Sequence, residues 1–162
     1  FIKIEALDLN GNFLKKKFAF IDSNAHEKLK RSQLESDDIL FSIAGALGRV
    51  AIVKDEFLPA NTNQALAIIR LNQTKNINIK YVYFALISDG VQKLIESISV
   101  QLAQANLSLK DISNLVIQVP HIQEQTKIAN FLTAIDDKIT HTQVQLEAVK
   151  QYKKGLLQQM FV

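Results

Sequence analysis

The pattern of apolar and polar positions changes at Pro120. Before this residue, short apolar runs alternate with turn-forming residues, which is typical of strands and short helices. The runs that predict strands are FIKI (1–4), KFAFI (17–21), DILFSIA (38–44), RVAIV (49–53), ALAIIRL (65–71) and NLVIQV (114–119). We therefore predict an α+β domain with a mostly antiparallel or mixed sheet over residues 1–120.

Short helices are predicted between these runs. Asn24 precedes Glu27, and Ser108 precedes Asp111, by the three residues of a capping box, which marks the start of a helix. Residues 78–99 show helical apolar spacing that an Asp-Gly pair interrupts, so this segment forms two helices or one with a break.

The segment 121–162 has a different character. From about Gln123 it contains no proline and no strand-like alternation, which predicts a single helix of nearly 40 residues, roughly 60 Å long. Residues at alternating spacings of four and three form a coiled-coil seam along it: Ile128, Leu132, Ile135, Ile139, Thr142, Leu146, Val149, Lys153, Leu156 and Met160. Because a domain of about 120 residues has a radius of gyration of only about 14 Å, much of the seam must pair outside it.

Two polar residues, Thr142 and Lys153, interrupt the seam. Either they lower the stability of the coiled coil, or they fix its register or orientation against a partner helix. The sequence leaves both interpretations open.

A glycine-containing loop, SIAGALGRVAIV, lies between two strand-like runs. Gly45 and Gly48 are three residues apart and Arg49 follows them, but neither GxGxxG nor GxxxxGK[ST] is present. The residues after Arg49 favour a strand over a helix. A tight turn with Arg49 projecting from it is therefore the main interpretation, and a phosphate-holding loop is the alternative.

Composition narrows the class of protein. The chain has 162 residues, a net charge of +3 and a pI near 9.1, which permits nucleic-acid binding without requiring it. It has no cysteine, and its three histidines lack metal-ligand spacing, so we predict neither a disulfide nor a metal site. No apolar stretch reaches the roughly 18 residues of a membrane span. We expect a cytoplasmic protein without a membrane contact.

Positive charge gathers in one part of the chain. Lys15, Lys16, Lys17, Lys28, Lys30 and Arg31 face only two acids over that stretch, Asp22 and Glu27. Such a run is either a solvated face or a source of phosphate contacts. Together with Arg49, these six residues are our candidates for DNA binding.

Enzyme signatures are missing. Adenine methyltransferases need an Asn/Asp-Pro-Pro-aromatic loop, and the two prolines of this chain, Pro59 and Pro120, are not adjacent. Asp136 and Lys138 match part of a metal-dependent nuclease pattern, but residues two apart on a helix point to different faces. We therefore predict no catalytic residue in this chain.

Three longer stretches, KLKRSQLESDDILFSIAGALGRVAIV, PANTNQALAIIRL and QANLSLKDISNLVIQVPHIQEQTKIANFLTAIDDKI, occur in an order that resembles the specificity subunits of type I restriction-modification enzymes. The most specific part is 120–139, where the helix that follows each target recognition domain is matched by Glu124, Gln125, Ile128, Ala129, Leu132, Asp136 and Ile139. The Gly45–Gly48–Arg49 loop and Asn63–Gln64 are weaker markers, and the two amides can equally well serve backbone groups at the entry to a strand.

The resemblance implies a function. In that family a target recognition domain reads half of a bipartite double-stranded DNA sequence, and two long helices pair antiparallel as a ruler. The subunit docks methyltransferase subunits and, through them, restriction subunits. S-adenosylmethionine, Mg²⁺ and ATP are used by those partners, so we expect no cofactor in this chain.

This sequence departs from the family pattern in two respects. It has one recognition domain and one long helix instead of two of each, and its opening FIKIEALDLNGNF resembles a point inside a recognition domain. We therefore expect a fragment, a truncated product or a half-subunit whose first strands precede this sequence. The partner helix is then either a second copy or the second half of a longer subunit. A different class, a coiled-coil adaptor without DNA specificity, is the alternative.

Overall fold

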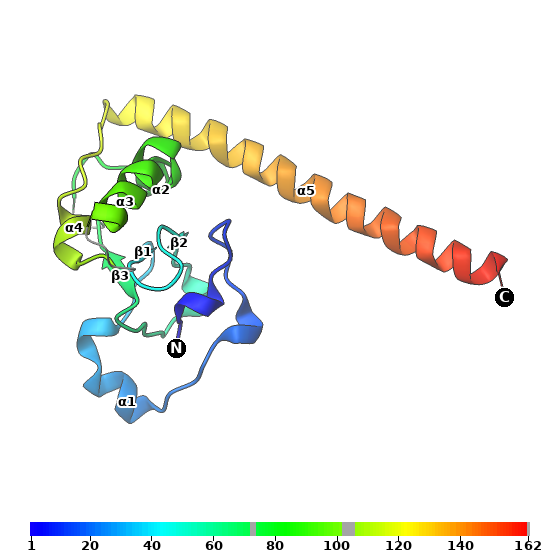
Figure 1. Ribbon diagram of the computed structural model, residues 1–162, viewed down its shortest axis with the longest axis horizontal. Helices are drawn as coiled ribbons and strands as arrows, with labels where there is room; N and C mark the ends of the chain where they lie inside the picture. The colour runs from blue at the N-terminus through cyan, green and yellow to red at the C-terminus, as the bar shows by residue number, and fades with distance from the viewer. Residues whose placement is uncertain (72–73, 102–105, 162) are drawn as a thin grey trace.

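The computed structural model describes residues 1–71, 74–101 and 106–161 (Figure 1). A compact N-terminal part is followed by one long helix that leaves it. The elements in chain order are α1 (Ser23–Lys28), β1 (Ile39–Ser42), β2 (Val50–Ile52), β3 (Leu66–Ile69), α2 (Ile79–Ile87), α3 (Asp89–Gln101), α4 (Leu109–Ser113) and α5 (Ile122–Met160), with 3-10 turns at Ile4–Ala6, Lys15–Lys17, Lys30–Ser32 and Asp55–Phe57. The predicted α+β class is confirmed.

The sheet has three strands in the order β2-β1-β3, and both pairings are antiparallel. Parallel pairing occurs, among the described residues, as an isolated bridge between Ile2 and Thr62, so the sheet is antiparallel rather than mixed. The β1–β2 connection holds Gly45 at φ 76° and Gly48 at φ 77°. Glycine reaches this left-handed region without steric cost, which explains why the predicted tight turn forms here.

Three of the predicted strands do not form. The run 1–4 makes the single Ile2 bridge and enters a 3-10 turn, while 17–21 and 114–119 contain no strand. Phe20 is 93% exposed and Val116 is 86% exposed, so neither run is buried along its whole length. An apolar run becomes a strand only beside an available sheet edge, and the sequence does not show where such edges lie.

The sheet separates two apolar cores. Successive strand side chains point to opposite faces, so Leu40 packs with Ile2 and Leu7, whereas Ile39 and Phe41 pack on the other side. The second core is completed by Val82 and Leu86 of α2 and by Ile95 of α3. The first residues of the chain and the helices α2 and α3 therefore cover opposite faces of the sheet.

Helix starts were predicted with mixed success. The Asn24 capping box was wrong, because α1 begins after Asp22, whose carboxylate accepts a 2.7 Å hydrogen bond from the Ala25 amide. The Ser108–Asp111 capping box at α4 is confirmed. The predicted break within 78–99 is also confirmed, but it falls at Ser88, and the Asp89–Gly90 pair that we expected to interrupt the helix begins α3 instead.

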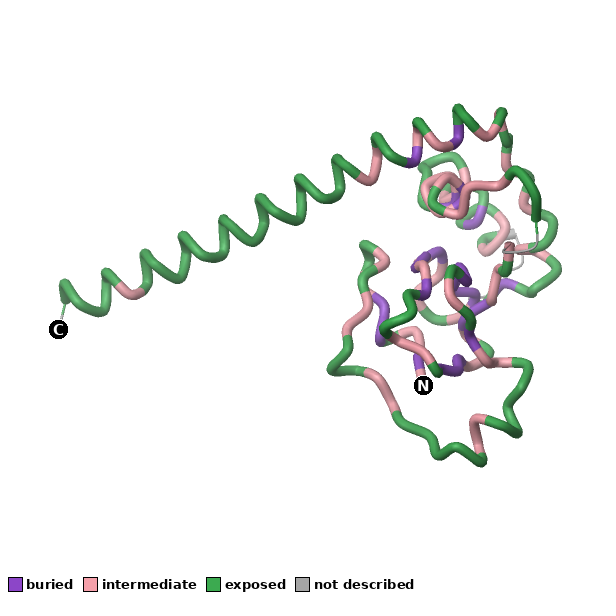
Figure 2. The backbone as a smooth tube through the Cα atoms, turned by 180° about the vertical axis from the view of Figure 1, so that it is seen from behind, coloured by how far each residue is buried: buried purple, intermediate pink, exposed green. Residues whose placement is uncertain are grey.

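Helix α5 is 39 residues long, which confirms the single helix of nearly 40 residues predicted from the lack of proline and of strand-like alternation. Its first turns pack against α2, and it then extends away from the rest of the molecule. Figure 2 shows nearly all of this extension in the colour of exposed residues.

Candidate nucleic-acid interface

The six clustered cations are presented by two separate turns. Lys15–Lys17 form a 3-10 turn, whereas Lys28 ends α1 and the next two cations lie in the 3-10 turn Lys30–Ser32. All six side chains are exposed. Both turns lie on the side of the sheet away from α5, joined by the extended residues 18–22 (Figures 1 and 2).

Aromatic packing holds the first turn. The rings of Phe13 and Phe57 lie 4.5 Å apart, and Phe18 contacts both edge-on, with centroids 6.2 and 5.6 Å away. Lys15 lies 5.2 Å from the Phe57 ring and 2.5 Å from the Glu56 carboxylate. Lys15 is therefore paired within the molecule. The hydrogen bond that its ammonium donates to Glu56 lowers the pKa of that carboxyl.

A buried amide holds the second turn. Asn61 is 1% exposed, and its Nδ2 donates to the Leu29 carbonyl at 3.1 Å and to Ser32 Oγ at 3.0 Å. Its Oδ1 lies 2.5 Å from His26 Nδ1 in α1. These contacts hold the backbone between α1 and the 3-10 turn Lys30–Ser32 in place. The backbone that carries Lys28, Lys30 and Arg31 is therefore anchored to Asn61.

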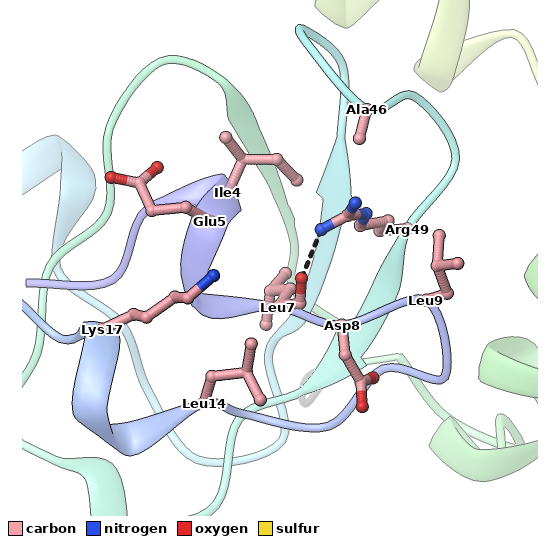
Figure 3. A pocket seen from close by; sticks show the side chains of 9 residues that line it. All are labelled: Ile4, Glu5, Leu7, Asp8, Leu9, Leu14, Lys17, Ala46 and Arg49. Atoms are coloured by element: carbon pink, nitrogen blue, oxygen red, sulfur yellow. Dashed lines mark hydrogen bonds between the residues drawn. The ribbon is translucent and has the colours of Figure 1, made fainter.

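Arg49 does not project from the β1–β2 turn as predicted. Its guanidinium Nη1 donates to the Leu7 carbonyl, and its Nε is buried without a hydrogen-bond partner in the described part of the chain (Figure 3). The side chain thus crosses from the turn to the first residues of the chain. Its acceptor is 42 positions away in sequence, so local pattern could not reveal this orientation.

Arg49 and Lys17 line a surface hollow of about 470 Å³. Apolar side chains form most of its wall: Ile4, Leu7, Leu9, Leu14 and Ala46. Two acids complete it, but each has other partners: Glu5 lies 4.0 Å from Lys3, and Asp8 accepts hydrogen bonds at 2.8 Å from the amides of Asn10 and Asn12. Within the described residues, neither cation of the hollow forms an ion pair.

The surroundings of Asp8 in the hollow change its pKa. Partial burial acts to raise the pKa, but the hydrogen bonds from Asn12 and Asn10, with a smaller contribution from the charge of Arg49, lower it below its usual value. Asp8 is therefore a carboxylate at neutral pH, and its oxygens are occupied by Asn12 Nδ2 as well as by the two amides.

One glutamine joins α5 to the rest of the molecule. Gln125 is 1% exposed, its Oε1 accepts from the Asn78 amide at 2.9 Å, and its Nε2 donates to the carbonyls of Asn76 and Pro120 at 3.0 and 2.8 Å. Asn78 is also the N-cap of α2. The starts of α2 and α5 are therefore tied together by a single side chain.

The coiled-coil seam divides into two sections. Ile128 and Leu132 line an apolar groove of about 380 Å³ with Phe84 and Ala85 of α2 and are half-buried. The six apolar seam positions that follow, from Ile135 to Met160, are 37–71% exposed. Thr142 and Lys153 are exposed as well. Among the described residues, the hydrogen bonds and ion pairs of the second section join positions within α5 itself.

Comparison with known proteins then identifies the family. Residues 2–151 match the family model described as the type I restriction modification DNA specificity domain. The chain belongs to this family. The resemblance found in the sequence is thereby confirmed over most of the chain.

Specificity subunits are among the chain's relatives. It is 34% identical over 100 residues to the type I restriction enzyme EcoBI specificity subunit of Escherichia coli, covering 61% of this chain and 20% of that protein. It is 28% identical over 151 residues to the putative MjaX specificity subunit of Methanocaldococcus jannaschii, covering 90% and 35%. This specificity-family chain thus spans about a fifth to a third of the length of these relatives.

Sequence reasoning missed several anchoring residues of this family member. Arg70 donates to both oxygens of the buried Asp38 carboxylate at 2.7 Å and to Glu35 at 2.6 Å. This arginine is therefore paired within the molecule and is not a candidate for DNA binding. Hydrogen bonding to Asp38, with a smaller contribution from the charges of Asp38 and Glu35, raises the pKa of Arg70 against the opposing effect of burial. Gln125 was named among the residues that carry the family resemblance, but the sequence did not show that its side chain is buried and anchors α5.

Residues 1–71, 74–101 and 106–161 lack two further kinds of feature. They contain no group of three or more histidine, aspartate or glutamate side chains that could hold a metal ion. None of the helices described there is both long and apolar enough to cross a membrane.

Proposed function

We propose that this chain is the DNA-reading part of a type I restriction-modification specificity subunit and that it reads one half of a bipartite double-stranded target. The observation that carries the proposal is the family match over residues 2–151. In this proposal the chain supplies no catalytic group and no cofactor. S-adenosylmethionine, Mg²⁺ and ATP act in the methyltransferase and restriction subunits that it docks.

The exposed cations supply the sequence-independent part of DNA affinity. Lys16, Lys17, Lys28, Lys30 and Arg31 form no ion pair in the described part of the chain, so their charges are available to phosphates. Lys15 can contribute once it exchanges Glu56 for a phosphate. Phosphate contacts of this kind position a protein on the duplex, and base-edge contacts then specify the sequence.

The hollow beside Arg49 is the second contact in this proposal. In the part of the chain that the structure describes, its two cations form no ion pair, while Glu5 lies near Lys3 and Asp8 accepts hydrogen bonds from Asn10 and Asn12. A DNA phosphate at its mouth would accept hydrogen bonds from Lys17 and from the guanidinium of Arg49. Phe20, exposed between the two cationic turns, is placed to contact base or sugar edges.

A salt titration tests the interface. We expect the affinity of the full chain for duplex DNA to fall steeply with salt, because neutralised phosphates release counterions. The slope of log K against log salt is negative, and the triple variant Lys28→Ala, Lys30→Ala, Arg31→Ala should make it about 3 less negative. Each lost phosphate contact reduces the magnitude of the slope by about 1.

The matched control removes the same charge elsewhere. Lys75, Lys110 and Lys127 are exposed and lie outside both turns, so their triple alanine variant should keep the original slope. Equal slopes for the two variants would show that the cationic turns are not the interface. Undetectable DNA binding by the unmodified chain would favour the protein-interaction adaptor.

Arg49 is tested separately. We expect Arg49→Ala to weaken DNA binding of the assembled complex and to leave the domain folded, as measured by circular dichroism beside the binding assay. Unchanged binding across the salt range would remove Arg49 from the interface.

The exposed seam of α5 is the proposed surface for pairing with a second recognition domain. We propose that the exposed seam of α5 pairs antiparallel with a second copy or with the second half of a longer subunit, holding two recognition domains apart. Light scattering over a range of concentrations tests this, with Ile135→Glu and Leu146→Glu combined as the disrupting variant. A dimer that this variant breaks supports pairing between copies, whereas a folded monomer shows that the partner helix belongs to another chain or segment.

A further inference from the structure

The β1–β2 turn that carries Arg49 is held on its inner side by one buried hydroxyl. Ser42 is fully buried, and its Oγ donates to the Ala46 carbonyl at 2.5 Å and accepts from the Arg49 amide at 2.8 Å. The Gly48 amide donates to the Ser42 carbonyl at 3.1 Å. The backbone of the turn is therefore fixed from within, immediately before the arginine side chain begins.

Gln92 of α3 holds the same turn from its outer side. Its Nε2 donates to the Gly48 carbonyl at 3.1 Å and to the Leu86 carbonyl at 2.8 Å. Leu86 lies in the last turn of α2, where helix carbonyls have no partner within the helix. A side-chain amide has two N–H donors, so Gln92 uses both of them to join the end of α2 to the turn.

The contact between Gln92 and the turn is close. A Cβ on Gly48 would lie 2.3 Å from Gln92 Oε1, so any other residue at this position would displace the glutamine amide. Gly48 also has a φ angle of 77°, which favours glycine. Gln92 thus lies directly on the backbone of the residue that precedes Arg49.

Arg49 and Gln92 line different hollows of the surface. Arg49 lines the hollow that it shares with Lys17, and its guanidinium donates to the Leu7 carbonyl (Figure 3). Gln92 lines a separate hollow of about 350 Å³, together with Leu47 and other residues of α3. An effect of Gln92 on a phosphate held by Arg49 and Lys17 would therefore pass through the backbone of the turn.

The Arg49 guanidinium depends on this backbone for its direction. Among the described residues, it donates one hydrogen bond, to the Leu7 carbonyl, and its Nε is buried without a partner. A long side chain with so few polar contacts of its own follows the backbone that carries it. Groups that contact a ligand need supporting residues that hold them within about 0.5 Å of the productive position.

We infer that Gln92 is a positioning residue for Arg49: by holding Gly48 it sets the direction in which the guanidinium points, and it contacts no DNA itself. This inference rests on the proposed contact between Arg49 and a DNA phosphate, and it adds the residue that orients the arginine. A Gln92 that only joined α2 to the turn would affect folding and leave the direction of Arg49 unchanged. The two roles predict different results when both residues are changed.

A double-mutant cycle separates these roles. Gln92→Met keeps the length of the side chain but removes both N–H donors, and the cycle combines it with Arg49→Ala. The affinity of each chain for a mixed-sequence DNA duplex is measured at one low salt concentration. Because Gln92 acts through Arg49, Gln92→Met should weaken binding about fivefold in the unmodified chain and less than about twofold in the Arg49→Ala chain. An equal loss in both backgrounds would overturn the inference, as would no loss in a chain whose binding Arg49→Ala weakens.

The matched control makes the same change at another glutamine. Gln123 of α5 is exposed, so Gln123→Met should alter the affinity less than about twofold in either background. Circular dichroism shows whether each chain is folded. If Gln92→Met does not fold, Gln92→Asn replaces it in the cycle. Its amide is one methylene shorter and is withdrawn from the Gly48 carbonyl, so the same pattern with a smaller loss is expected.

A measurement without DNA tests the positioning itself. A buried Nε–H exchanges slowly with water, and the signal of Arg49 in a proton–nitrogen correlation spectrum is assigned by its loss in Arg49→Ala. Gln92→Met should speed the exchange of this proton at least about tenfold, whereas Gln123→Met should leave it unchanged. An Arg49 Nε–H that exchanges at the same rate with and without the Gln92 amide would overturn the inference.

The two measurements distinguish failure of this inference from failure of the proposed function. If Arg49→Ala leaves DNA affinity unchanged and Gln92→Met still speeds the exchange, Arg49 is removed from the interface while its positioning by Gln92 stands. If Arg49→Ala weakens DNA binding and the Arg49 proton does not respond to Gln92→Met, the interface stands and the positioning role is overturned.

Discussion

The two sections of α5 have the same seam spacing but opposite environments. Over Ile122–Leu132 the helix is tied to α2 by the buried Gln125 and by the groove that Ile128 and Leu132 line. From Ile135 onward the apolar seam positions are exposed. Heptad spacing therefore indicates which face of a helix is apolar, whereas the three-dimensional structure decides what that face contacts.

The difference has an energetic consequence. Isolated helices are only marginally stable in water, and most helical stability in proteins comes from packing of an apolar face. The first section obtains that packing within its own chain. In the proposed function a partner helix supplies the packing of the second section, so its stability should vary with protein concentration.

The largest effect on stability is expected from removing the Gln125 side chain, which joins the starts of α2 and α5. Gln125→Ala leaves the Asn78 amide and two carbonyls without their buried partner, which should lower the free energy of unfolding by about 3 kcal/mol. Urea denaturation of the dilute chain measures this. The exposed Gln123→Ala on the same helix is the control and should change stability by less than about 0.5 kcal/mol.

A leucine pair compares the two sections directly. Leu132→Ala removes a half-buried side chain beside α2 and should cost about 1 kcal/mol in dilute solution. Leu146→Ala makes the same change on the exposed section and should cost less than about 0.5 kcal/mol there. At high concentration the order should reverse in an assay of self-association. Equal costs in dilute solution would mean that both sections are stabilised in the same way.

The smallest effect concerns acid sensitivity, which the N-terminal part should show through Asp8. Its pKa is lower in the folded chain, so the stability that it contributes is present above the unfolded pKa of about 3.9 and is lost as pH falls through the folded pKa. Comparing Asp8→Asn with the unmodified chain by urea denaturation, we expect a difference of about 0.3 kcal/mol at pH 6 that vanishes at about pH 2, because the site is partly solvated.

Asn12→Ala tests the physical cause of this shift. It removes the side-chain donor to Asp8 and should reproduce part of the same pH dependence. A pH-independent difference for both variants would show that they act through packing alone.

The features predicted correctly are those with strong local signals. The lack of proline and of strand-like alternation predicted α5, the glycine pair predicted the β1–β2 turn, and the Ser108–Asp111 box predicted the start of α4. The contacts that the sequence did not show involve distant partners. The Arg49 guanidinium turns toward a carbonyl 42 positions away, and the Gln125 side chain bonds groups 47 and 49 positions away.

The candidate interface shows the same division. Sequence located the cationic residues, and the structure divides them between two turns held by Phe57 and its neighbouring rings and by Asn61. The sequence could not show that Lys15 is paired with Glu56, because that contact joins segments 41 positions apart. Whether the individual cations touch DNA stays a prediction for the salt titration.

The hydrogen bonds of Gln125 at the base of α5 also have a mechanical consequence. The helix beyond Leu132 is a lever arm of roughly 42 Å, at 1.5 Å per residue. A rotation of about 5° at its base would therefore displace its tip by roughly 4 Å, close to one base-pair step of DNA. If the chain sets the distance between two recognition domains on a duplex, as proposed, that distance depends on how rigidly α5 is held at its base, where the buried Gln125 amide makes three hydrogen bonds.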